Sequence, residues 1–111
     1  MRVYKYDIIR TMKINKSPQL PKFLQPFLWS VKIEDLDSDK DKIYIINQIL
    51  AFGNIKALKW LFETYPLIEI KQIFLKHSMK IYRKESFNFV RKILLNIDKP
   101  VNQKKYVATI F

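Results

Sequence analysis

The sequence predicts a mainly α-helical fold, a compact bundle of four to five short helices. Nearly half of the 111 residues are apolar, which is enough to build one buried core. Glycine occurs once, at Gly53, so the chain lacks the Gly-containing turns that tight β-hairpins favour. Apolar residues recur at spacings of three and four in stretches separated by Pro, Gly and Asn, which is typical of short helices joined by turns.

Three segments follow from the composition along the chain. We expect an N-terminal arm or strand at 1–19, a helical domain at 20–97 and a C-terminal tail or strand at 98–111. The two ends contain β-favouring runs, at 3–10 and 105–111, that could pair as a small terminal β structure. Alternatively, the tail could order as a strand on a partner.

The helical domain opens with the segment LPKFLQPFLW at 20–29. Pro21 suits the first turn of a helix, whereas Pro26 would end or kink it. The aromatic side chains of this segment are expected to form a hydrophobic plug, as core or as a lid: Phe23, Phe27 and Trp29.

An acidic loop at 34–42 precedes the first regular helix. Its Asp and Ser side chains can cap the free N–H groups of a helix that runs to Phe52. Gly53 stands where a left-handed helix cap is wanted. The apolar face expected for this helix comprises Ile43, Ile46, Ile49 and Leu50.

Three further helices are predicted, at 55–65, 67–77 and 87–96. Asn54 caps the first, Pro66 separates the second, and Ser86 caps the third. Their buried positions, read from the helical spacing, are Ile55, Leu58, Leu61, Phe62 and Tyr65, then Ile70, Ile73, Phe74 and His77, then Phe87, Val90, Ile93 and Leu94.

Residues suited to catalysis are scarce, so we expect a protein that is not an enzyme and that uses no cofactor. The sequence has no Cys, a single His at position 77, and no phosphate-binding loop motif. The alternating acids between Asp35 and Asp41 resemble a calcium loop, but Lys40 and Ile46 stand where that loop needs Gly and Glu. Helix capping explains these acids better, and a docking surface for a basic partner is the alternative.

The net charge of +11 suggests an anionic partner, because the basic residues gather towards the two ends of the chain. The candidate nucleic-acid-binding residues are Lys76, Lys80, Arg83, Lys84, Arg91 and Lys92. Tyr82 is interleaved among them, and basic residues beside an aromatic ring can follow a phosphate backbone. The connector at 78–84 is too long for a helix-turn-helix, and a solvated basic face remains the simpler interpretation.

Trp60 projects away from the apolar stripe of helix 55–65. It is either covered on a second side of the helix or exposed as an anchor for a partner. The candidate partner-binding residues are Phe27, Trp29 and Trp60.

Residues 20–96 also resemble a known family. The resemblance rests on LPKFLQPFLW, on Gly53 followed by WLFETY at 60–65, and on Asn88-Phe89. The family is a small prokaryotic domain of unknown function, encoded beside nucleotidyltransferase-type toxins of the abortive-infection kind. Membership would imply an antitoxin or accessory component whose partner is the toxin. Val90 stands where that family often has Trp.

We therefore expect a non-catalytic interaction protein, antitoxin-like, with a protein partner such as a nucleotidyltransferase toxin. The alternative is a basic nucleic-acid-binding module or transcriptional autoregulator, and a small enzyme comes third. The first ten residues lack the apolar run of a secretory signal, and no apolar stretch suits a membrane span, so we expect a cytoplasmic protein. Homo-oligomerisation stays open.

Overall fold

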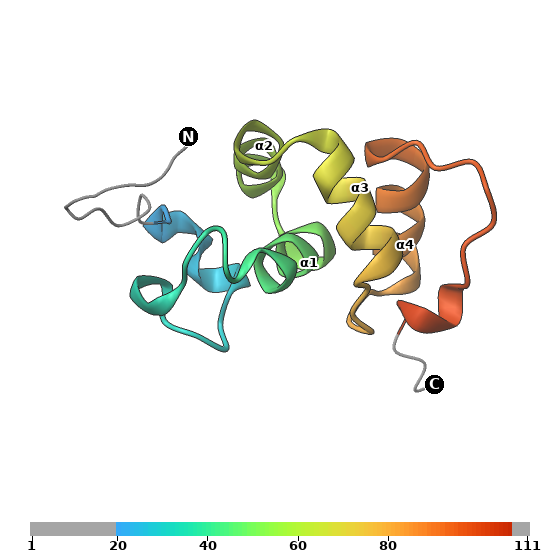
Figure 1. Cartoon of the computed structure of the whole chain (residues 1–111). Helices are drawn as coiled ribbons and strands as arrows, with labels where there is room; N and C mark the ends of the chain where they lie inside the picture. Colours follow the sequence, from blue (N-terminus) through green and yellow to red (C-terminus); the bar gives the residue numbers. More distant parts are fainter. Residues whose placement is uncertain (1–19, 108–111) are drawn as a thin grey trace.

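The computed structural model describes residues 20–107, and this part of the chain is mainly helical. Its four α-helices are α1 (Lys42–Phe52), α2 (Ile55–Thr64), α3 (Leu67–Lys76) and α4 (Lys84–Phe89) (Figure 1). Three 3₁₀ turns, η1 (Lys22–Phe27), η2 (Ile33–Asp35) and η4 (Gln103–Lys105), and one π-helical turn, η3 (Val90–Leu94), complete the described helical elements. The predicted helical fold class is confirmed.

The described range contains no β-strand. One isolated parallel bridge joins Tyr82 to Val107. The pairing expected between 3–10 and 105–111 cannot be compared, because 3–10 lies outside the described residues.

Helix α1 is the centre of the fold. It contacts α2, α3, α4 and η1. All seven residues from Ile45 to Ala51 are buried, including the polar Asn47 and Gln48. A helix covered on all sides is expected to be apolar nearly all round, which explains why this helix is rich in Ile and Leu. Ile43 was predicted as core but is 39% exposed, because it lines an open pocket between the first turn of α1 and α3.

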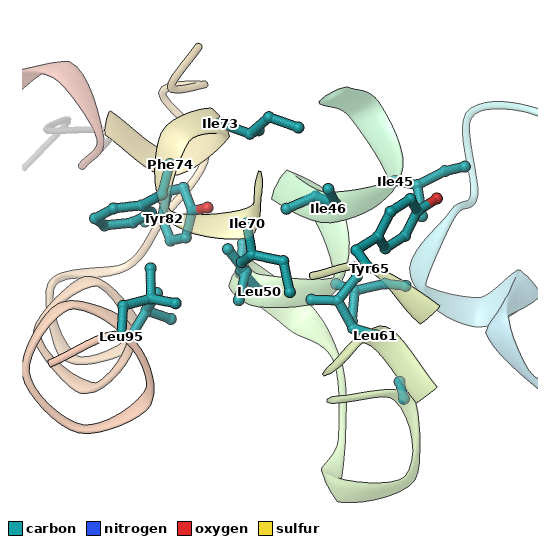
Figure 2. Close-up of a cluster of buried hydrophobic side chains, with 14 of the residues drawn as sticks. Ile45, Ile46, Leu50, Leu61, Tyr65, Ile70, Ile73, Phe74, Tyr82 and Leu95 are labelled. Carbon is teal, nitrogen blue, oxygen red and sulfur yellow. The ribbon is translucent and has the colours of Figure 1, made fainter. Parts of the chain in front are cut away.

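The core runs from one side of α1 to the other (Figure 2). Ile45, Leu61 and Tyr65 lie at one end of the cluster, Phe74, Tyr82 and Leu95 lie at the other, and Leu50 and Ile70 lie between them. The predicted core positions Ile70, Ile73 and Phe74 of α3 are confirmed as buried, whereas His77 is exposed at the end of that helix.

The chain after α4 returns along the outside of the helices to the start of α4 (Figure 1). Tyr106 enters the core there, and its hydroxyl donates a 2.7 Å hydrogen bond to the carbonyl oxygen of Phe74. Its ring lies 4.6 Å from the ring of Phe74 and 4.8 Å from that of Phe87. The backbone N–H of Tyr82 donates to the Tyr106 carbonyl at 2.9 Å. Tyr106 and Val107 are thus packed in the core, and Val101 is partly buried against it.

The prediction for Gly53 is wrong in its reason. Gly53 follows α1 with φ −69° and ψ 155°, so it is extended and not left-handed. A Cβ at this position would lie 2.6 Å from the carbonyl oxygen of Ile49 and 3.2 Å from the Cβ of Ala57. Glycine is needed here because the chain passes close to both α1 and α2. The predicted cap at Asn54 is confirmed, since its side chain accepts a 2.9 Å hydrogen bond from the N–H of Ala57.

The last predicted helix differs in its start. It begins at Lys84, so Ser86 lies within the helix and does not cap it. It then widens into the π-helical turn η3, in which the N–H of Leu95 donates to the carbonyl of Val90, five residues earlier.

The extra residue of this π turn also changes which side chains face the core. Leu95 is buried, whereas the predicted core residue Ile93 is 67% exposed. The left-handed conformation expected at Gly53 occurs instead after this turn, at Asn96, with φ 50°.

The acidic loop caps its own backbone, and this corrects the expectation that it caps α1. Asp37 accepts hydrogen bonds from the N–H groups of Asp39 and Lys40, at 2.8 and 2.9 Å. Asp41 precedes α1, but its side chain accepts from the N–H of Asp37 and makes no cap bond. In α2, Ile55 was predicted as core but is 79% exposed, because the buried stripe of that helix begins at Ala57.

Candidate functional site

Trp29 is the most exposed aromatic side chain among the large apolar residues of the described range. Its exposed fraction is 58%. It lies in the loop between η1 and η2, directly after the buried Leu28. The prediction of an aromatic hydrophobic plug is therefore wrong for Trp29. The buried side chains of this segment are Leu24 and Leu28, while Phe23 and Phe27 are only partly buried.

One side chain holds the backbone of this loop. The Nε2 atom of Gln25 donates hydrogen bonds of 3.0 Å to the carbonyl oxygens of Leu28 and Val31. Its Oε1 atom accepts a 2.9 Å hydrogen bond from the N–H of Ile33. The side-chain amide of Gln25 thus bonds backbone groups on both sides of Trp29. It satisfies groups that backbone–backbone hydrogen bonds would satisfy in a regular turn.

Side chains of helix α1 also bond the backbone of this loop. The buried side chain of Gln48 donates to the carbonyl of Phe27 at 2.9 Å, and the hydroxyl of Tyr44 accepts from the N–H of Ser30 at 3.3 Å. The indole of Trp29 lies edge-on to the ring of Phe52, with the ring centroids 4.9 Å apart. We call residues 25–33, which are held in this way, the Trp29 loop.

The other predicted partner-binding residues lie differently. Phe27 belongs to the Trp29 loop and is partly buried against the core. Trp60 is also partly buried and meets the ring of Tyr65 edge-on, at 6.0 Å between centroids. The hydroxyl of Tyr65 in turn donates to the carbonyl of Ser38 at 2.6 Å. Within residues 20–107 no ring contact joins Trp29 to Trp60, so the structure gives no single aromatic patch from the three candidates.

The basic candidates spread over the C-terminal half. Lys76 ends α3, Lys80 and Arg83 lie in the connector, and Lys84 begins α4. These four side chains and Lys92 are exposed, while Arg91 on η3 is partly buried. The ion pairs found in the described range both involve Lys42, with Asp39 and Glu69, so none of the six candidates is paired with a described carboxylate.

Tyr82 does not belong to an exposed basic and aromatic surface. It is 1% exposed, and its ring packs edge-on against Phe74 at 5.8 Å. Burial raises the pKa of its hydroxyl well above the ordinary value. The interpretation of Tyr82 as a ring that follows a phosphate backbone is therefore wrong.

Several exposed residues escaped sequence reasoning. Phe89 and Ile93 are 45% and 67% exposed, one turn apart on α4 and η3. Lys99, Lys104 and Lys105 are also exposed, and Lys99 and Lys105 line a pocket together with Lys76 of α3. Their charge was visible in the sequence, but the position of Lys99 and Lys105 beside Lys76 depends on how the chain folds back after η3.

Within the described range, the residues considered for catalysis do not converge on one site. His77 is exposed at the end of α3. Between residues 20 and 107 no three His, Cys, Asp or Glu side chains converge to hold a metal ion. The helices of this range are too short or too polar to cross a bilayer.

One family matches part of the chain, at residues 23–74. It is described as a family of unknown function (DUF6922). The matched stretch is just under half of the chain and runs from η1 to the end of the core in α3, so it contains Trp29, Gln25 and Trp60. The basic residues from Lys76 onward lie beyond it. Comparison with curated proteins gives no match, and comparison with solved structures gives none either.

Proposed function

We propose that the protein is a non-catalytic interaction module that inserts the indole of Trp29 into a pocket on a partner protein. The observation that carries this proposal is an exposed Trp on a loop whose backbone is fixed by three hydrogen bonds from Gln25. Trp is enriched among the residues that dominate binding energy at protein interfaces.

The fixed geometry of the loop favours binding over a purely structural role. A side chain that serves only the core would be buried, yet more than half of the Trp29 surface is open. A loop that is already ordered loses little conformational freedom when it docks, so more of the contact energy appears as affinity. The buried Gln48 and the hydroxyl of Tyr44 also bond the backbone of this loop, so the position of the loop is fixed relative to α1.

The partner that we propose is a toxin enzyme of the nucleotidyltransferase kind, encoded beside this protein and met in the cytoplasm. This choice follows the resemblance of residues 20–96, in which Trp29 is one of the matching positions. In that arrangement the module would act as an antitoxin-like component, neutralising or assisting its partner. A second copy of this chain is the simplest competing occupant of the Trp29 surface.

Co-expression with the enzyme of the neighbouring gene tests the proposal. We expect a stable complex and relief of toxicity, and we expect Trp29→Ala to weaken the complex by about 30-fold or more, the effect of a hot-spot residue. Ile55→Ala is the matched control, since Ile55 is more exposed than Trp29 but lies outside the loop. A complex that tolerates Trp29→Ala as well as Ile55→Ala would exclude the indole as the anchor. Sedimentation of the protein alone identifies self-association.

The second candidate function is nucleic-acid binding, and a separate observation favours it. Residues 76–107 hold nine Lys and Arg against two acids, and none of these nine is paired with a described carboxylate. Binding through these residues should weaken steeply with salt, because condensed counterions are released. Reversal of charge at Arg83, Lys84, Arg91 and Lys92 should abolish it. Binding that survives those changes would remove this candidate.

A further inference from the structure

Three lysines from separate parts of the chain surround one pocket in the C-terminal half. Lys76 comes from the end of α3, Lys99 from the returning chain, and Lys105 from η4. The pocket has a volume of about 320 Å³, and no acidic residue of the described range 20–107 lines it. Its remaining wall is formed by Leu75, Pro100, Val101, Asn102 and Tyr106.

The walls of this pocket are fixed by the core. Tyr106 is buried, donates to the carbonyl of Phe74 and accepts from the N–H of Tyr82. The side chain of Asn102 caps η4 by accepting a 3.1 Å hydrogen bond from the N–H of Lys104. Lys105 therefore lies on a short turn that Asn102 caps and that the buried Tyr106 follows. On the other wall, the guanidinium of Arg91 lies 3.5 Å from the carbonyl of Lys99.

The three ammonium groups have no described counter-charge. None of them forms an ion pair with a carboxylate of residues 20–107. Asp98 neighbours Lys99 in sequence but does not line the pocket. Three positively charged side chains line one hollow, so an anion would be attracted there. Lysine binds phosphate oxygens as a point charge, which suits a ligand with several of them.

We infer that this pocket binds a small ligand with two or more linked phosphate groups, of the nucleoside di- or triphosphate class. A single phosphate carries too little charge to balance three lysines, whereas a pyrophosphate group matches them. The volume is at the lower end of the range for small-ligand sites, and the apolar wall of Leu75, Pro100 and Val101 leaves room for an uncharged part of the ligand. The site lies beyond the stretch that matches the family of unknown function.

Calorimetric titration of the full chain with sodium pyrophosphate at constant ionic strength tests the inference. We expect one site per chain, and we expect the double variant Lys99→Gln/Lys105→Gln to weaken it by about tenfold or more. Lys80→Gln/Lys92→Gln is the matched control, because it removes two exposed charges from the same half of the chain outside the pocket. We expect this control to change the affinity by no more than about twofold. Lys76→Gln gives a second variant on a different wall.

Three results would overturn the inference. The first is no heat of binding with the wild-type chain. The second is an equal loss in the two double variants, which would mean diffuse attraction to the basic half. The third is orthophosphate binding as tightly as pyrophosphate. A competition experiment with an oligonucleotide distinguishes the two sources of phosphate groups. The inference requires pyrophosphate to compete with the oligonucleotide for Lys99 and Lys105. The site is independent of the proposed partner binding, so Trp29→Ala should leave it unchanged.

Discussion

The hydroxyl of Tyr82 donates a 2.9 Å hydrogen bond to the side-chain oxygen of Asn47, and both side chains are buried in the core. The amide nitrogen of Asn47 donates to the carbonyls of Ile43 and His77, at 2.9 and 3.0 Å. A single polar side chain on α1 therefore joins the end of α3 to the connector that leads into α4. All of its polar atoms are satisfied, which is the condition for a polar group to be tolerated in a core.

Replacing Asn47 by Leu should destabilise the fold by about 2–4 kcal/mol, because the Tyr82 hydroxyl would be buried without a partner and the His77 carbonyl would lose its donor. Urea denaturation measures this loss. The double variant Asn47→Leu/Tyr82→Phe has no unpaired hydroxyl. Its loss of unfolding free energy should therefore be smaller than the sum of the losses in the two single variants. Strict additivity of the two would show that the bond is not made.

Gly53→Ala should destabilise the protein by about 1–3 kcal/mol, through overpacking against Ile49 and Ala57. The backbone at Gly53 has an ordinary extended conformation that alanine can also adopt. If there were free space for a Cβ at this position, alanine would therefore stabilise the protein, because it restricts the unfolded chain. The sign of the change in thermal midpoint therefore shows whether Gly53 is required by close packing or lies in an open connection between α1 and α2. Asn54→Ala, which removes the cap of α2, gives a reference loss of about 1 kcal/mol.

Stability should fall as the pH rises above about 10, the ordinary pKa of tyrosine. Burial raises the pKa values of Tyr65, Tyr82 and Tyr106, and the hydrogen bond to Glu69 raises the pKa of Lys42. Below this pH these groups hold their protons in both states. Above it the unfolded chain loses protons that the folded chain retains, which favours unfolding.

Urea denaturation between about pH 8 and pH 11 measures this dependence. Tyr82→Phe removes one of the titrating groups and should make the decline with pH shallower than in the wild-type chain. A free energy of unfolding that stays level or increases across this range would contradict the buried, protonated state of the three phenols.

Gln25→Ala should weaken the proposed complex although the side chain serves the loop and not the partner. Without its three hydrogen bonds the Trp29 loop must be ordered at the moment of binding, at a cost of about 1–2 kcal/mol, or roughly tenfold in affinity. Surface plasmon resonance with the co-expressed enzyme gives the affinity. Ile55→Ala serves again as the control, and a wild-type affinity for Gln25→Ala would show that the loop needs no fixing.

The central helices were predictable because local signals define their ends. Asn54 caps α2 and Pro66 separates it from α3, and both act within a few residues of chain. The π turn at η3 was not predictable from spacing, because Val90, Ile93 and Leu94 fit an ordinary helical stripe equally well. Packing of Leu95 against the core selects the wider turn, and that contact depends on elements distant in sequence.

The candidate site shows the same division. The sequence singled out Trp29 as an aromatic that could meet a partner, but not Gln25, whose role depends on the carbonyls of a loop with no regular pattern. Tyr82 was assigned to a basic surface because its neighbours in sequence are charged. It is buried because Tyr106 and Asn47 meet it from elsewhere in the chain. Lys99 and Lys105 gain their place beside Lys76 from that same return of the chain.

The most direct test of the central claim observes Trp29 itself. In the variant Trp60→Phe, Trp29 is the sole tryptophan, so labelling with 5-fluorotryptophan gives one fluorine resonance from this chain. We expect that resonance to move when the unlabelled neighbouring-gene enzyme is added, and its shift between H₂O and D₂O to disappear as the indole leaves solvent. A complex that forms while both the resonance and its solvent shift stay unchanged would contradict the account.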